Sequence, residues 1–114
     1  MKLVTNLVLG LNRAALAEGL AFAESLGLDP AATLGVLRDS MAYSRIMDTK
    51  GPKMIARDFI PEARLSQHLK DVRLILKSGG TLPLSTLHRD LLEQLENAGH
   101  GELDNSAIIK AFQK

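Results

Sequence analysis

The fold is decided at the start of the chain, where residues 1–26 read MKLVTNLVLGLNRAALAEGLAFAESL. Apolar residues recur in this stretch at intervals of three and four, the period of an α-helix with one buried face. Only Gly10 and Gly19 interrupt the pattern, and each costs about 1 kcal/mol relative to Ala. A helix of about 24 residues is roughly 36 Å long, so we expect a spine around which shorter helices pack.

The middle of the chain carries stop and start signals for shorter helices. Gly27 is predicted to end the first helix. The pair Asp29-Pro30 is predicted to begin the second, with Asp as the N-cap and Pro in the first turn. Within residues 44–55 we expect two short helical turns with a break at Gly51-Pro52. Residues 57–61 are predicted to form a loop.

Two further amphipathic helices are predicted in the second half of the chain. One covers residues 65–77, and the other runs from Pro83 to the stop signal at residues 99–101. Residues 104–106 would cap a last short helix that ends near Phe112. No segment alternates apolar and polar residues for long enough to predict a strand. The sequence therefore predicts an all-α fold, a single domain of five to seven helices built around the long N-terminal helix.

The composition is that of an ordinary globular domain and excludes several classes of function. A hydrophobic share of 46% in 114 residues argues against disorder, and a net charge of +1 argues against a nucleic-acid partner. Without cysteine the chain can form no disulfide, thiolate zinc site or thiol nucleophile. Its apolar stretches are broken before the ~20 residues that a membrane span needs. Because no signal peptide is recognisable either, we expect a cytoplasmic protein.

Common motifs for nucleotide and metal binding are missing from the sequence. Its nine glycines form neither GxGxxG nor GxxxxGK, so the chain supplies no pyrophosphate-binding loop of its own. The three histidines, His68, His88 and His100, share no ligand spacing, and we expect no metal site.

Polar residues at two places stand out by their position on predicted helices. Lys2 and Asn6 are four residues apart and therefore share one face of the first helix. The dipole at a helix N-terminus disfavours a cation, which makes Lys2 a readier proton donor. Lys70 and Asp71 are adjacent in a helix, so their side chains point in different directions. From spacing alone, the favoured interpretation of both pairs is that they are solvated surface residues.

Seven segments that include these residues follow one another in an order that is characteristic of a known family. They are residues 1–6 (MKLVTN), 18–24 (EGLAFAE), 27–30 (GLDP), 44–46 (SRI), 58–59 (DF), 68–74 (HLKDVRL) and 101–107 (GELDNSA). They are spread over nearly the whole length of the chain, which in these segments resembles the β-hydroxyacid dehydrogenases, the family that includes 3-hydroxyisobutyrate dehydrogenase and tartronate semialdehyde reductase. The link over residues 78–83 is several residues shorter than is usual in this family.

The resemblance implies that residues 1–114 are an all-helical C-terminal domain for substrate binding and dimerisation. The N-terminal Rossmann domain of such an enzyme is absent from this chain, and the long first helix would join the two. The resemblance assigns catalysis to Lys2, substrate binding to Asn6, and a place near the cofactor to Lys70. The implied reaction is hydride transfer between NAD or NADP, bound mainly by the N-terminal domain, and a small 3-hydroxy acid or its semialdehyde.

The same resemblance implies a homodimer or a higher homo-oligomer, without a nucleic-acid or membrane partner. We expect this chain alone to be inactive. Two alternatives stay open at this point: a non-catalytic helical oligomerisation module of the same superfamily, and a freestanding helical protein that merely resembles the domain. A severed domain should expose apolar surface along residues 1–26 and associate.

Overall fold

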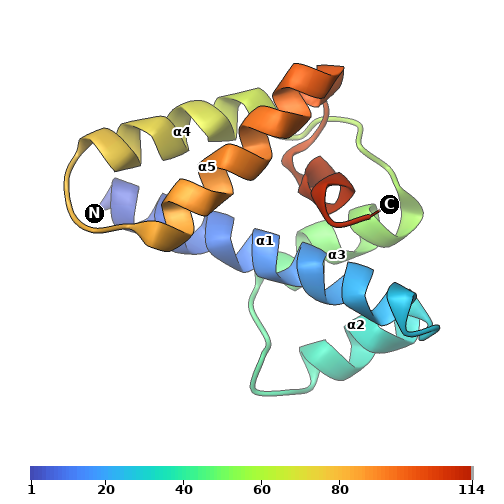
Figure 1. Ribbon diagram of the computed structural model, residues 1–114. Helices are drawn as coiled ribbons and strands as arrows, with labels where there is room; N and C mark the ends of the chain where they lie inside the picture. Colours follow the sequence, from blue (N-terminus) through green and yellow to red (C-terminus); the bar gives the residue numbers. More distant parts are fainter. Residues whose placement is uncertain (114) are drawn as a thin grey trace.

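A computed structural model describes residues 1–113 as a set of helices arranged around one long helix (Figure 1). The α-helices are α1 (Lys2–Ser25), α2 (Pro30–Arg38), α3 (Ile46–Ala56), α4 (Leu65–Lys77) and α5 (Pro83–Leu95). A π-helical turn, η1 (Glu96–His100), and a 3₁₀ helix, η2 (Asn105–Ala111), follow α5. The described residues contain no strand, which confirms the predicted all-α fold.

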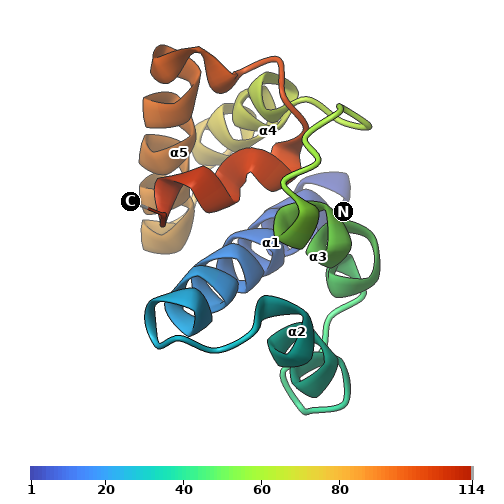
Figure 2. The ribbon, with the colours of Figure 1, turned by 90° about the vertical axis from the view of Figure 1, so that its right-hand side faces the viewer.

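Helix α1 is the spine of the domain, as its length predicts. Helices α4 and α5 lie on one side of α1 and α2 lies on the other, while η2 crosses close to α1 (Figure 1, Figure 2). Five elements pack against α1, namely α2, α3, α4, α5 and η2. The largest fully buried apolar side chains come from α1, α3, α4, α5 and η2, namely Leu20, Met54, Leu65, Leu69, Leu92, Ile108 and Ile109.

The predicted boundary between the first two helices is confirmed in detail. The amides of Gly27 and Leu28 donate to the carbonyls of Glu24 and Ala23 at 3.0 and 2.9 Å, the pattern of a Schellman cap. Gly27 has φ 79°, a conformation that glycine adopts without strain. The carboxylate of Asp29 then accepts a hydrogen bond from the Ala32 amide at 2.8 Å and caps α2.

The predicted break at Gly51-Pro52 is wrong, because α3 continues through both residues. Gly51 is buried against α2, and a Cβ at this position would lie 2.8 Å from Leu34 Cδ1. Glycine therefore permits close packing of two helices here instead of ending one. Pro52 removes one helical hydrogen bond, but the burial of Met47 and Met54 on the same helix stabilises it by about 1.5–3 kcal/mol per side chain.

The short link between α4 and α5 is a tight turn. Gly79 and Gly80 both have positive φ, 116° and 84°, which lets the chain reverse within five residues, 78–82. The two helices that it joins pack directly against each other. Within the described part of the chain, no helix is both long enough and apolar enough to cross a membrane.

Candidate functional site

The N-terminal turn of α1 carries the first two candidate residues. Lys2 is the first residue of the helix and is exposed, and Asn6 lies one turn later and is half-buried. Because Lys2 and Asn6 are four residues apart on this helix, the ammonium and the amide share one face.

Lys70 lies on the solvent-facing side of α4. The inward face of that helix is formed by Leu65, His68, Leu69, Val72 and Ile75, whereas Lys70 is exposed and Asp71 half-buried. Among residues 1–113, Lys70 makes no ion pair and no side-chain hydrogen bond. The structure thus places Lys70 on a helix that packs against α1, without a direct bond to Lys2 or Asn6.

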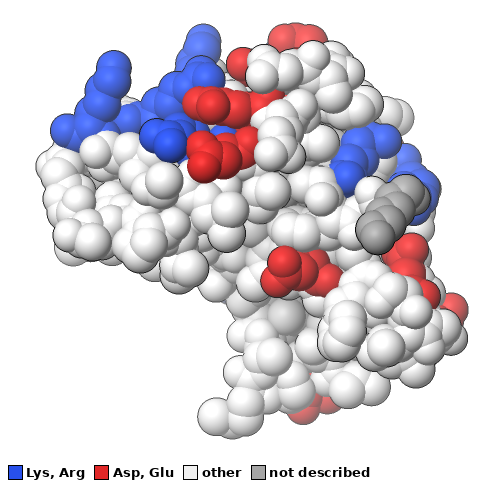
Figure 3. Space-filling model, in the orientation of Figure 1, with Lys and Arg blue, Asp and Glu red and all other residues white. Residues whose placement is uncertain are grey.

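Basic side chains gather over α4, whereas the surface below them, over the start of α5, carries few charges (Figure 3). Two arginines of this region have carboxylate partners: Arg73 pairs with Glu93 at 3.2 Å, and Arg89 with Asp90 at 3.1 Å. Lys70 therefore lies in a cationic region whose arginines already have partners.

Close contact at Gly10 fixes α1 against α4 and α5. A Cβ on Gly10 would lie 2.3 Å from His68 Nε2 and 3.1 Å from His88 Cε1. The two imidazole rings have centroids 5.3 Å apart and are tilted by 48°. The contact sets the position of the helix that carries Lys2 and Asn6 relative to the helix that carries Lys70.

Both histidines are neutral at neutral pH. Burial, the charge of Arg13 and the neighbouring His88 lower the pKa of His68 to about 3. Burial and Arg13 lower the pKa of His88 to about 4. Arg13 itself is only 4% exposed, and burial lowers its pKa to about 10, although the charge of Asp104 opposes this. Arg13 therefore stays charged inside the domain.

Asp104 is the centre of a second buried polar cluster. Both of its carboxylate oxygens accept hydrogen bonds from Lys50 Nζ at 3.0 Å, and it further accepts bonds from the amides of Glu62, Ala63 and Ser106 and from the Ser106 hydroxyl. Burial alone would raise the pKa of Asp104, but the hydrogen bonds from Ser106 and from the amides of Glu62 and Ala63 hold it well below its usual range. The cluster ties α3 and the loop before α4 to the start of η2.

Sequence reasoning missed the buried charges Arg13, Lys50 and Asp104. Asp104 carries the local signal of an N-cap, which was recognised, but its bond to Lys50 joins residues 54 positions apart. No local pattern reports such a pair. For Arg13 a signal exists, since it follows the contact residue Gly10 by three positions and therefore lies near the inward face of α1.

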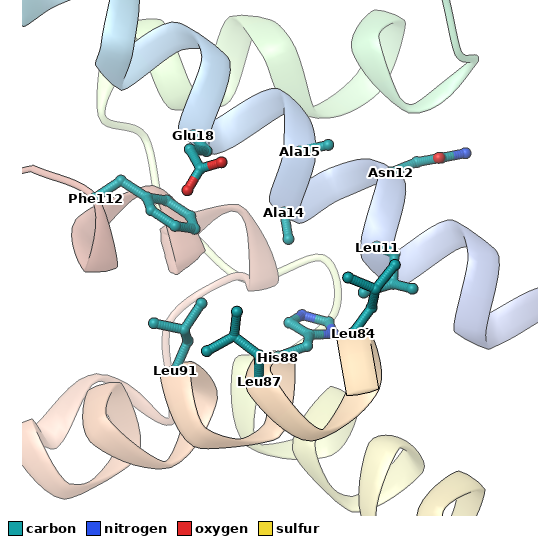
Figure 4. Close-up of a pocket in the computed structure, with 10 residues that line it drawn as sticks. All are labelled: Leu11, Asn12, Ala14, Ala15, Glu18, Leu84, Leu87, His88, Leu91 and Phe112. Atoms are coloured by element: carbon teal, nitrogen blue, oxygen red, sulfur yellow. The ribbon is translucent and has the colours of Figure 1, made fainter. Parts of the chain in front are cut away.

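A groove of about 330 Å³ runs between α1 and α5 (Figure 4). Leucines of α5 point across it toward α1, and Phe112 lies at one end (Figure 4). Its lining is mainly apolar and consists of Leu11, Asn12, Ala14, Ala15, Glu18, Leu84, Leu87, His88, Leu91 and Phe112. Lys2, Asn6 and Lys70 are not part of it. The groove is thus a surface suited to apolar contact, separate from the candidate site.

Comparison with known proteins matches nearly the whole chain to one protein family. The model of a family described as NAD-binding of NADP-dependent 3-hydroxyisobutyrate dehydrogenase matches residues 1–112. The 2-hydroxy-3-oxopropionate reductase of Escherichia coli (strain K12) is 33% identical over 116 aligned positions, which cover 98% of this chain and 40% of that protein.

Two solved structures share the fold. A 3-hydroxyisobutyrate dehydrogenase from Salmonella typhimurium superposes with a TM-score of 0.93 at 26% identity, over 97% of this chain and 40% of that one. The 3-hydroxyisobutyrate dehydrogenase of Mycobacterium tuberculosis, described with L-serine, gives 0.85 at 26% identity, over 99% and 42% of the two chains. The chain therefore spans about 40% of the length of the proteins that it resembles.

Proposed function

Because this chain belongs to the family of NADP-dependent 3-hydroxyisobutyrate dehydrogenases, we propose that it is the substrate-side helical domain of a nicotinamide-dependent dehydrogenase. Its substrate would be a small 3-hydroxy acid or the corresponding semialdehyde. The observation that carries the proposal is the match over residues 1–112 together with the position of Lys2 and Asn6 on one exposed helix terminus. The intact enzyme would include a preceding Rossmann domain.

In this proposal Lys2 is the catalytic residue. Its ammonium donates a proton to the carbonyl oxygen of the semialdehyde, or its amine accepts one from the hydroxyl in the other direction. The same charge stabilises an oxygen that becomes negative in the transition state. Asn6, one turn further on, has a donor and an acceptor and orients the substrate's oxygens.

The cofactor is NAD or NADP, bound mainly by the preceding domain, and its nicotinamide supplies or accepts the hydride. Lys70 fits a place beside it, because this exposed ammonium on a cationic region lacks a carboxylate partner among residues 1–113. A free cation suits the negative charge of the dinucleotide phosphates.

The comparisons support the substrate class. The Escherichia coli relative is named for 2-hydroxy-3-oxopropionate, and the Mycobacterium tuberculosis structure is described with L-serine. Both molecules are small, and each carries a carboxylate and a second oxygen on the third carbon. A site with an ammonium and an amide on one helix face can bind such a pattern of oxygens.

The proposed partners are the enzyme's own Rossmann domain and at least one further copy of the chain. Exposed apolar side chains on α1 and α5, including Val4, Val8, Leu84 and Leu87, support association. A monomer at every micromolar concentration in light scattering would instead favour a freestanding helical protein. The cytoplasmic location expected from the sequence stays a prediction.

The test uses the full-length enzyme that includes the Rossmann domain. Lys2→Ala should lower kcat by about 10²–10⁴-fold with cofactor affinity nearly unchanged, and Asn6→Ala should mainly raise KM for the hydroxy acid. Lys70→Ala should weaken cofactor binding. Lys77→Ala, two turns further along α4 and also exposed, is the matched control and should change neither quantity.

Wild-type turnover in the Lys2→Ala enzyme would refute the catalytic assignment. If no dehydrogenase activity is found with any small hydroxy acid, the alternative gains support: a non-catalytic oligomerisation module with the same fold. The 114 residues on their own are expected to show no hydride transfer in either case.

A further inference from the structure

Gly10 lies where the backbone of α1 meets a side chain of α4. A Cβ at this position would lie 2.3 Å from His68 Nε2 and 2.7 Å from His68 Cε1, whereas ordinary van der Waals contacts of a Cβ begin at 3.4 Å. Any side chain at residue 10 would therefore require the α1 backbone and the His68 ring to move apart by about 1 Å.

The ring of His68 has little room to yield to such a side chain. His68 is only 7% exposed, and the centroid of the His88 ring lies 5.3 Å from its own. The same Cβ would also lie 3.1 Å from His88 Cε1, so the second ring limits the space at this point. Because protein interiors are close-packed, the displacement would be passed on to the backbone of α4.

This contact joins the two helices that carry the proposed site. Gly10 lies on α1 with Lys2 and Asn6, so these three residues move together. His68 and Lys70 are two residues apart on α4 and likewise move as one element. The distance between the backbones of α1 and α4 at Gly10 therefore sets how far the Lys70 ammonium lies from the N-terminal turns of α1.

We propose that Gly10 is a positioning residue of the enzyme: its contact with His68 holds α4 close to α1 and so keeps Lys70 within reach of the cofactor phosphates. The inference rests on the proposed function, in which Lys2 and Asn6 meet the substrate and Lys70 meets the cofactor. Gly10 itself contacts neither of these molecules. Its influence acts through α4 and belongs to cofactor affinity, whereas the groups of the chemical step lie on α1 itself.

Cofactor binding to the full-length enzyme tests the proposal, with NADH and NADPH as probes in fluorescence titrations. Gly10→Ala should raise Kd about 10-fold, because one charge-assisted contact is lost, while kcat at saturating cofactor stays nearly unchanged. Gly19→Ala is the matched control, since it is the same substitution on the same helix at a point where a Cβ meets nothing within 4 Å. This control should bind the cofactor as the wild type does.

Two double variants show whether the effect passes through α4. In the Lys70→Ala background, Gly10→Ala should weaken cofactor binding no further, because the contact that it disturbs is already absent. The second double variant, Gly10→Ala with His68→Ala, lacks the ring that the new methyl group meets and should bind the cofactor with nearly wild-type affinity. This variant keeps the test decisive even if Gly10→Ala alone does not fold.

Three results would overturn the positioning role and leave the proposed function intact. They are wild-type cofactor affinity in Gly10→Ala, equal weakening by Gly10→Ala with and without Lys70, and weak binding in the folded double variant that lacks His68. Wild-type cofactor affinity in Lys70→Ala would instead refute the cofactor contact of the proposed function, and the positioning role would fall with it.

Discussion

The buried carboxylate of Asp104 pairs with Lys50 and also accepts hydrogen bonds from Ser106 and from the amides of Glu62 and Ala63. Replacing Asp104 by Asn should lower the free energy of unfolding by about 3–5 kcal/mol, because Lys50 would remain buried with only the exposed carboxylate of Glu62, 3.6 Å away, as a counter-charge. Urea denaturation at pH 7 measures this difference.

The exposed ion pair between Arg38 and Asp48 is the control for that prediction. Its atoms are 3.0 Å apart, as in the Lys50–Asp104 pair, but the side chains are 52% and 36% exposed. Asp48→Asn should therefore cost only about 1 kcal/mol or less. Equal losses in the two variants would show that burial does not decide the strength of these pairs.

The contrast between Lys2 and Lys50 shows which residues a sequence can reveal. Lys2 and Asn6 were recognised because four residues in a helix bring two side chains to one face. Lys50 and Asp104 meet only after α3, the loop before α4 and η2 have packed together. A contact that depends on tertiary structure leaves no periodic signal, and the same holds for the contact between His68 and His88.

At the scale of single helices, glycine has two roles in this chain. Gly27 has positive φ and ends α1, a local property that the sequence predicted correctly. Gly51 lies inside α3, where it allows Leu34 to approach. This second role depends on a neighbouring helix, which explains why a break was wrongly predicted at Gly51-Pro52.

Substitutions of Gly10 and Gly19, both inside α1, distinguish the effect of intrinsic helix propensity on stability from the effect of packing. Gly19→Ala should stabilise the chain by about 0.5–1 kcal/mol, because a Cβ there meets nothing within 4 Å. Gly10→Ala should instead destabilise it by about 1–2 kcal/mol, since the new methyl group must displace the buried ring of His68. Urea denaturation of both variants measures the difference, and stabilisation by Gly10→Ala would mean that His68 moves freely.

For the molecule as a whole, three buried titratable groups give acid sensitivity in two separate pH ranges. His68 and His88 have folded pKa values of about 3 and about 4, below the 6.5 of an unperturbed histidine. The unfolded chain therefore binds more protons below pH 6.5, and stability falls as the pH is lowered. The depressed pKa of Asp104 acts in the same direction but only below about pH 4, where the unfolded aspartate becomes protonated.

Between pH 6.5 and 5, the free energy of unfolding should therefore fall by on the order of 2 kcal/mol for each of the two histidines. Urea denaturation at half-unit pH steps measures this slope. His88→Leu removes one of the two groups. The slope of the unfolding free energy against pH should then correspond to about one bound proton fewer, while the loss of stability below pH 4 that Asp104 causes should persist. A stability that is constant from pH 6.5 to 5 would contradict the prediction, because it would mean that the folded domain accepts protons on His68 and His88 beside the charge of Arg13.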